Sequence, residues 1–206
     1  MPLQMHTKSI KGRAVFAESG FIGASIVLAF ALQDWDEERD IEERTHIALC
    51  NVKSELTFNR FLLEGDYIPR QQGLIATVQG AITTLNSQSD AQMQRSNLEQ
   101  MILQESLRYS AWRLSAESGY LLHADFELAT EIGSLFDYQS DSYQPLIVRI
   151  NDAIFDRSTD IDDNPIEYYI SLSGLLSEWA AQTNYLQQKY ESLFSDEKFL
   201  ALDCQE

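Results

Sequence analysis

The sequence predicts an all-α protein, with an N-terminal transmembrane helix that continues into a long helix and is followed by an antiparallel helical bundle. The first observation is that only 9 Gly and 4 Pro occur among 206 residues, too few for the many turns of an all-β fold. The second is an apolar content of 44% with 23% charged residues, which is typical of a folded chain. The third is one long apolar run near the N-terminus, at residues 14–33.

The apolar run reads AVFAESGFIGASIVLAFALQ, and Glu18 is its only charged residue. Twenty helical residues span about 30 Å, which is close to the hydrocarbon thickness of a bilayer. Trp35 follows at the position of an interfacial aromatic residue. Because the uninterrupted part, residues 19–32, is short, two alternatives stay open. One is a cleaved secretory signal that ends at Ala29-Phe30-Ala31, and the other is a buried helix of a soluble protein.

Basic residues on the two sides of this run predict its orientation. Three precede it, at Lys8, Lys11 and Arg13, whereas Arg39 and Arg44 follow it. Since basic flanks stay in the cytoplasm, residues 1–13 are predicted to be cytoplasmic and the rest extracytoplasmic. We therefore expect a single-pass protein of the cell inner membrane. Its predicted parts are the cytoplasmic N-terminus (1–13), the transmembrane helix (14–33), an acidic helical domain (34–195) and a flexible tail (196–206).

The strong acidity of the chain excludes one class of partner. The net charge is −17, and the residues after Leu32 contain 12 Lys/Arg against 31 Asp/Glu. A domain of this charge is repelled by phosphate backbones, so we expect no nucleic acid to bind.

Small residues within the apolar run suggest a contact between transmembrane helices. Gly20 and Ala24 are four residues apart, as are Ser25 and Ala29. Such spacing allows two helices to approach closely, and Glu18 could hydrogen-bond across the pair. These five residues are the candidate contact site, with a homo-oligomer or another envelope protein as the partner.

A heptad seam follows the apolar run and predicts a long helix. Its members step by four and three residues: Thr45, Leu49, Val52, Leu56, Asn59 and Leu63. The seam could pair two chains in a coiled coil, but it lasts less than three heptads, which favours packing inside one bundle. Gly65 and Pro69 predict a kink or break after it.

Further helices are indicated along the remainder of the chain. An apolar stripe covers residues 74–85, residues 86–97 read as a loop, and Leu98, Ile102 and Leu107 suggest a short helix. Ser110 is a candidate cap for a helix that holds Trp112 and ends near Ser118-Gly119.

Two longer helices are expected after that turn. Asp125 should cap a helix that reaches about Asp156 and bends at Pro145, and Asn164 with Pro165 should open the last helix. The predicted inward residues are, in the first helix, Phe126, Ile132, Leu135, Leu146, Ile150 and Ile154, and in the second, Ile170, Leu172, Leu176, Trp179, Leu186, Tyr190 and Leu193.

The sequence offers no convincing metal, cofactor or catalytic site. His123, Asp125 and Glu127 lack metal-ligand spacing, and the acidic segment 160–164 departs from a calcium loop at Pro165 and Ser171. Phosphate-binding and nucleophile motifs are missing as well. Cys50 and Cys204 are 154 positions apart and are expected to be unpaired or opportunistically paired.

One stretch of the chain resembles a known group of proteins. The features are Glu18, the end of the apolar run at Leu28–Leu32 with Asp34 or Trp35, the charged Glu37–Arg39, and then Glu55-Leu56 and Asn59-Arg60. They resemble the opening of an uncharacterised family of bacterial single-pass membrane proteins, and AWRLSAESGYL resembles that family's turn between helices. Gln33-Asp34-Trp35 departs from the double aromatic usual there. The resemblance implies a retained anchor and a helical exported domain, and it implies no activity.

The function these observations favour is a non-enzymatic, membrane-anchored interaction or scaffold protein of the envelope. The first alternative is a ligand-sensing helical-bundle ectodomain that acts through a partner. The second is an enzyme that uses scattered carboxylates.

Overall fold

The computed structural model describes the backbone at residues 10–87, 98, 105–155 and 164–204, and side chains at residue 25 and from residue 27 onward within these ranges. The described residues form helices and contain no strand, which confirms the all-α prediction. They belong to two compact units, Met1–Arg44 and Thr45–Glu206.

The first unit consists of the N-terminal part of α1 (Ile10–Leu62). Its described side chains are exposed from Val27 to Asp40. Within the described residues, no helix is both long and apolar enough to cross a membrane. Most side chains of the predicted span, residues 14–24 and 26, lie outside the described ones.

The C-terminal part of α1 belongs to the second unit and buries the predicted heptad seam. All six seam residues are buried there, Asn59 included. This confirms the expectation that the seam packs within one bundle.

Two π-helical turns interrupt the helices at the places where a break or bend was predicted. The helix continues from α1 through η1 (Leu63–Tyr67) into α2 (Ile68–Ser87), and from α5 (Phe126–Tyr138) through η3 (Gln139–Tyr143) into α6 (Gln144–Phe155). Each π turn ends two residues before a proline, at Tyr67-Ile68-Pro69 and Tyr143-Gln144-Pro145. Proline lacks an N–H and its ring crowds the carbonyl four residues earlier, and the wider turn relieves that clash. Of the two predicted outcomes at Gly65 and Pro69, a kink or a break, the break is excluded, because the helix continues through the π turn.

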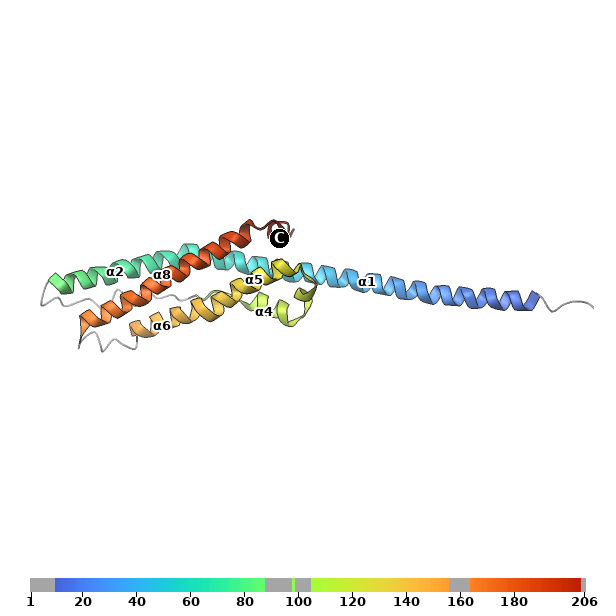
Figure 1. Cartoon of the computed structure of the whole chain (residues 1–206), viewed down its shortest axis with the longest axis horizontal. Helices are drawn as coiled ribbons and strands as arrows, with labels where there is room; N and C mark the ends of the chain where they lie inside the picture. The colour runs from blue at the N-terminus through green and yellow to red at the C-terminus, as the bar shows by residue number, and fades with distance from the viewer. Residues whose placement is uncertain (1–9, 88–97, 99–104, 156–163, 205–206) are drawn as a thin grey trace, which may run out of the picture. The chain divides into compact units, whose positions relative to one another are not determined.

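The last long helix, α8 (Pro165–Ser195), packs against α2, α5 and α6. Figure 1 shows it running back along α2, and in the opposite direction to α6. Pro165 occupies the first turn as predicted, but Asn164 does not cap the helix with its side chain. Its amide instead donates to the carboxylate of Glu167 at 2.7 Å.

Two short helices precede α5 in the chain. They are α4 (Ser110–Glu117) and η2 (Tyr120–His123), separated by a turn at Gly119. Gly119 has φ of +79°, a conformation that favours glycine, so the predicted helix end lies there. Ser110 is the first residue of α4 rather than its cap.

The predicted inward faces are buried with two exceptions. Phe126 is 82% exposed, because it immediately follows the Asp125 cap and points outward from the first turn of α5. Ile170 is 58% exposed, because the buried stripe of α8 runs through Tyr169, Leu172 and Leu176 and leaves Ile170 on the outer side. Both residues were assigned to the core incorrectly.

The C-terminal segment is folded onto the bundle rather than flexible. A short helix, α9 (Glu197–Leu200), buries Phe199 against Phe194, with 5.0 Å between ring centroids. The Asp196 carboxylate caps it by accepting from the Phe199 N–H at 2.9 Å. The predicted flexible tail at 196–206 is therefore corrected over the described residues 196–204.

Candidate binding site and its surroundings

The two π turns meet in the core through their tyrosines. Tyr67 and Tyr143 stack with 6.1 Å between ring centroids. The Tyr67 hydroxyl donates to the Glu105 carbonyl at 2.6 Å, and burial raises the pKa of Tyr67 to about 12. Gln144, which directly follows the second π turn, lies within hydrogen-bonding reach of the same hydroxyl. The contact therefore joins both π turns to the segment that precedes α4.

A buried hydrogen-bond network fixes the second of these tyrosines. The Tyr143 hydroxyl accepts from the Trp179 indole at 2.9 Å and lies 3.0 Å from the Thr183 hydroxyl, which in turn accepts from the Gln71 amide at 2.8 Å. Burial raises the pKa of Tyr143 far above its ordinary value. The network thus links Tyr143 of η3 directly to α8 and, through Thr183, to α2.

Asn59 provides a second fixed point. Its amide nitrogen donates to the Arg108 carbonyl at 2.6 Å, and its oxygen accepts from the Arg108 N–H at 2.7 Å. Because the backbone donor and acceptor cannot exchange roles, this pair determines which way the Asn59 amide points. The Asn59 nitrogen also faces Gln139 Oε1 at 3.4 Å, and the Tyr190 hydroxyl donates to that oxygen at 3.0 Å. The orientation of Gln139 is thereby determined too.

A pocket of about 400 Å³ lies where the segment before α4 faces η3. The residues that line it are Ser106, Leu107, Arg108, Tyr109, Phe136, Gln139, Ser140 and Gln144. Two of them carry a buried polar atom without a hydrogen-bond partner, the donor Nε2 of Gln139 and the acceptor Oε1 of Gln144. Both atoms are fully buried and so lie behind the surface of the pocket. The pocket is the candidate binding site because it is a mainly apolar hollow between two segments of the chain.

The charged residue in the lining of this pocket, Arg108, already pairs with other side chains. The Arg108 guanidinium donates to the Glu105 carboxylate at 3.2 Å and lies 3.4 Å from the centre of the Phe58 ring. Leu107 and Phe136 are buried and form apolar walls. The Trp112 ring stacks on Phe136 at 5.4 Å, which restrains the wall from behind. The lining of the pocket is therefore mainly apolar.

The buried carboxylate of Glu55, in the second unit, stabilises the start of α4. Buried Glu55 of α1 accepts from the Ser110 hydroxyl at 3.0 Å and from the N–H groups of Ala111 and Trp112 at 2.9 and 3.2 Å. These N–H groups belong to the first turn of α4, which the helix itself leaves unpaired. Glu55 thus replaces the cap that was expected from Ser110.

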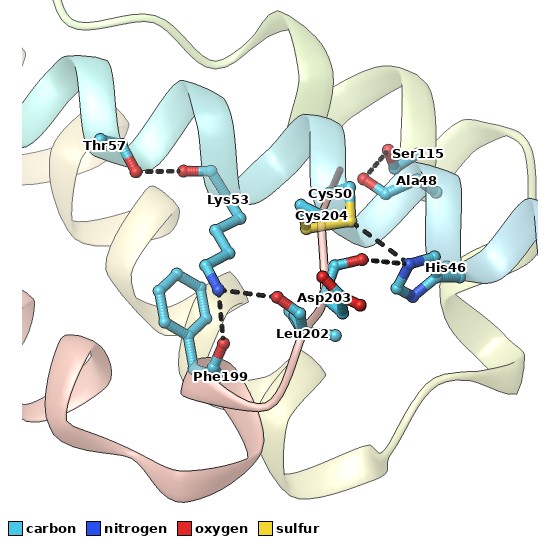
Figure 2. Close-up of a disulfide and its surroundings, with 10 residues drawn as sticks. All are labelled: His46, Ala48, Cys50, Lys53, Thr57, Ser115, Phe199, Leu202, Asp203 and Cys204. Atoms are coloured by element: carbon cyan, nitrogen blue, oxygen red, sulfur yellow. Dashed lines mark hydrogen bonds between the residues drawn. A yellow bond between two sulfur atoms is a disulfide. The ribbon is translucent and has the colours of Figure 1, made fainter. Parts of the chain in front are cut away.

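The two cysteines form a disulfide between α1 and the C-terminal segment. Cys50 and Cys204 have their Cα atoms 5.4 Å apart. Figure 2 shows the bond between α1 and the end of the chain, with the Lys53 ammonium donating to the carbonyls of Phe199 and Leu202 at 3.0 and 2.9 Å. The sequence left the pairing open because a separation of 154 positions says nothing about distance in the fold.

The residues considered as metal ligands have other roles. The Asp125 carboxylate caps α5 by accepting from the Leu128 N–H at 3.0 Å. The Lys198 ammonium pairs with the carboxylates of Asp125 and Glu127, both at 2.8 Å. The hydrogen bond from Lys198 lowers the pKa of Asp125, the direction opposite to that of a general acid at neutral pH. Within the described ranges no cluster of three potential ligands forms, and residues 160–163 lie outside them.

The predicted transmembrane contact falls mainly outside the described side chains. This applies to Glu18, Gly20 and Ala24, whereas Ser25 and Ala29 are described and exposed. The contact stays a prediction.

Comparison with known proteins returned no relative: no protein-family model, no curated protein and no solved structure matches this chain. The resemblance to the single-pass membrane family therefore stays a prediction, and function is argued from the geometry above.

Proposed function

We propose that the chain is a membrane-anchored helical domain of the bacterial envelope, held outside the cytoplasm, which works by binding partners rather than by catalysis. The observation that carries this proposal is the disulfide between Cys50 and Cys204. Disulfides persist in oxidising compartments and are rare in the cytosol. The bond thus supports the orientation suggested by the basic residues before the apolar run.

The anchor in this proposal is the apolar run at residues 14–33. The run and Cys50 belong to the same helix, α1, so the domain begins on the helix that contains the anchor. The twenty-residue length of the run supports a single span.

A binding role is supported by apolar side chains on the surface of the second unit. Leu122 is 87% exposed and Phe126 is 82% exposed, four positions later. Contact with a partner would remove these two apolar side chains from water. We propose a second copy of the chain as the partner, in keeping with the small residues of the apolar run.

Location and disulfide can be tested together in bacterial spheroplasts. We expect the chain to stay with the membrane after an alkaline carbonate wash and to be digested by protease added outside. A maleimide should label the cysteines only after reduction. Cys50→Ser is the control, because it should make Cys204 reactive without reductant. A soluble, protease-protected chain with freely reactive cysteines would contradict the proposal.

The partner can be tested by photocrosslinking in membranes. A photoreactive phenylalanine analogue at Phe126 should capture a second copy, whereas the same analogue at the exposed Ile170 should not. Equal yields at both positions, or a monomer in both cases, would argue against a specific assembly.

A further inference from the structure

We infer that the disulfide between Cys50 and Cys204 is a reversible exchange site, at which a small thiol attacks Cys204 and Cys50 is the sulfur that leaves. This inference goes beyond the function proposed above, because it concerns the reactivity of the bond and not the location or the partner of the chain. It rests on the surface position of the bond, on the other contacts that hold the C-terminal segment, and on the place of His46 beside Cys50.

The disulfide lies at the surface of the second unit rather than in its core. Cys50 and Cys204 are both half-buried, and two residues drawn beside the bond in Figure 2, His46 and Asp203, are exposed. Cys204 lies beyond α9, in the last described stretch of the chain. A small thiol can therefore approach the bond from solvent without an opening of the helical bundle.

Contacts other than the disulfide hold the C-terminal segment in place. The Lys53 ammonium donates to the carbonyls of Phe199 and Leu202 at 3.0 and 2.9 Å, and the Phe199 ring is buried. The Lys198 ammonium pairs with the Asp125 carboxylate at 2.8 Å. None of these contacts involves sulfur, so they can persist when the disulfide is reduced. The two thiols then stay close together, which favours their oxidation back to the disulfide.

His46 determines which of the two sulfurs leaves. Its Nε2 lies 2.9 Å from the Asp203 carbonyl oxygen and 3.7 Å from Cys50 Sγ, as Figure 2 shows. A carbonyl oxygen can only accept, so the hydrogen bond with Asp203 places a hydrogen on Nε2. The same N–H can donate to a thiolate that forms on Cys50. Because a sulfur leaves faster when its thiolate is more stable, this contact favours Cys50 as the leaving group.

The charged side chains near the bond favour the same direction. Two side chains that can carry a positive charge, His46 and Lys53, lie within about one helical turn of Cys50 along α1. The acid drawn near the bond, Asp203, directly precedes Cys204. Positive charge stabilises a thiolate and negative charge destabilises it. A thiolate is therefore more stable on Cys50 than on Cys204.

The exchange takes place in two displacements at sulfur. A thiolate attacks Cys204 Sγ and forms a mixed disulfide, while the bond between the cysteines breaks and Cys50 leaves as a thiolate with the bonding electron pair. A second thiolate attacks the external sulfur of the mixed disulfide and releases Cys204 as a thiolate. Both cysteines then take protons from water. The external thiols lose two electrons and the disulfide gains them, while the His46 N–H donates only a hydrogen bond.

The test uses the oxidised full chain in a mild detergent, with 2-mercaptoethanol as the probe because it has no charge for the acidic chain to repel. Excess maleimide stops the reaction early and labels the free sulfur, and peptide mass spectrometry shows which cysteine holds the probe. We expect the probe on Cys204 at least about three times as often as on Cys50, the effect of a hydrogen bond to the leaving thiolate. An even distribution, a preference for Cys50, or a bond that does not react would overturn the inference.

The matched variants are His46→Ala and His123→Ala. Both histidines are exposed, but His46 contacts Cys50 whereas His123 belongs to η2. We expect His46→Ala to bring the ratio of the two mixed disulfides close to one and His123→Ala to leave it unchanged. Cys204→Ser gives a second readout, because it leaves Cys50 as a free thiol. Its alkylation rate should rise with a midpoint below about pH 8.5, and His46→Ala should raise that midpoint. An unaltered ratio or midpoint in His46→Ala would overturn the role of His46.

Reversibility is measured on the reduced chain after the probe has been removed. Its helical circular dichroism should match that of the oxidised chain, because the contacts of Lys53, Lys198 and Phe199 remain. Addition of the oxidised probe, hydroxyethyl disulfide, should then restore the bond between Cys50 and Cys204. Loss of helical signal on reduction, or a chain that accumulates a mixed disulfide on each cysteine, would show that the two thiols separate and would overturn the inference.

Discussion

In the second unit, two buried side chains form hydrogen bonds with backbone N–H and carbonyl groups of other segments. Glu55 caps α4 from another helix, and Asn59 holds both backbone groups of Arg108. The heptad spacing identified Asn59 as a seam residue, but its partner could not be predicted because it lies 49 positions away. Glu55 was noted only within the family resemblance, and nothing in the sequence indicated its capping role, since one acid among many in an acidic chain is uninformative.

Glu55 provides a prediction at the residue scale. Replacing it with Ala leaves the N–H groups of Ala111 and Trp112 without their acceptor, and we expect a loss of about 2–3 kcal/mol in the free energy of unfolding. Glu55→Gln keeps one acceptor oxygen and should lose less. Urea unfolding followed by circular dichroism measures both.

The control for this prediction is Glu64→Gln on the surface of η1. Glu64 pairs with Arg60 at 2.8 Å but is half exposed, so its replacement should change stability by no more than about 0.5 kcal/mol. If Glu55→Ala were as mild as Glu64→Gln, the cap would contribute little to the fold.

At the scale of elements, helix positions could be predicted from the sequence more readily than helix junctions. Apolar periodicity located the buried stripes of α1, α6 and α8, because burial on one face imposes a spacing that can be read locally. Proline and glycine indicated where the helices deviate, but not that the deviation is a π turn. The stacking of Tyr67 on Tyr143, one residue from each π turn, could not be predicted either, because it is a tertiary contact.

The candidate pocket could not be predicted from the sequence either, because it is formed by tertiary contacts. Its lining comes from two separate stretches: residues 106–109, and the continuous helical stretch from the end of α5 through η3 to the start of α6. Neither Gln139 nor Gln144 stands out in the amino-acid sequence. An unpaired amide atom is recognisable only once all neighbours are placed, so no sequence pattern could have found this site.

The short helix α9 provides a prediction at the element scale. Phe199 is 1% exposed, whereas the next residue, Leu200, is 60% exposed. We expect Phe199→Ala to cost about 3 kcal/mol even with the disulfide intact, because the bond limits the unfolded chain but does not fill the cavity. Leu200→Ala should stay within about 0.5 kcal/mol. Urea unfolding under oxidising conditions compares them, and equal effects would show that α9 does not contribute to the core.

At the scale of the whole molecule, burial of phenol groups links stability to alkaline pH. Burial raises the pKa of Tyr67, Tyr143 and Tyr190 above the ordinary value of 10.0. Their hydroxyl groups stay protonated in the folded chain at pH values where the unfolded chain has already lost those protons. The stability they provide is therefore complete below pH 10 and decreases as the pH rises above it.

We expect the free energy of unfolding to fall steeply above pH 10. Each tyrosine that is neutral when folded and ionised when unfolded contributes about 1.4 kcal/mol per pH unit, so the three together give a slope of about 4 kcal/mol per unit. For Tyr67 the decline should end near pH 12, its pKa in the folded chain. Tyrosinate absorbance and helical circular dichroism, recorded on the same samples, should change in one cooperative step.

Tyr67→Phe tests the contribution of the hydroxyl group alone, because it keeps the aromatic ring. The variant should lose about 1 kcal/mol at neutral pH, because the hydrogen bond to the Glu105 carbonyl is gone. Between pH 10 and 12 its slope should be shallower by about 1.4 kcal/mol per unit, since one titrating group is missing. Tyr109→Phe is the control. Tyr109 is exposed, so loss of its hydroxyl group should leave the slope unchanged. If both variants gave the same alkaline profile, tyrosine burial would not be the cause of the decline.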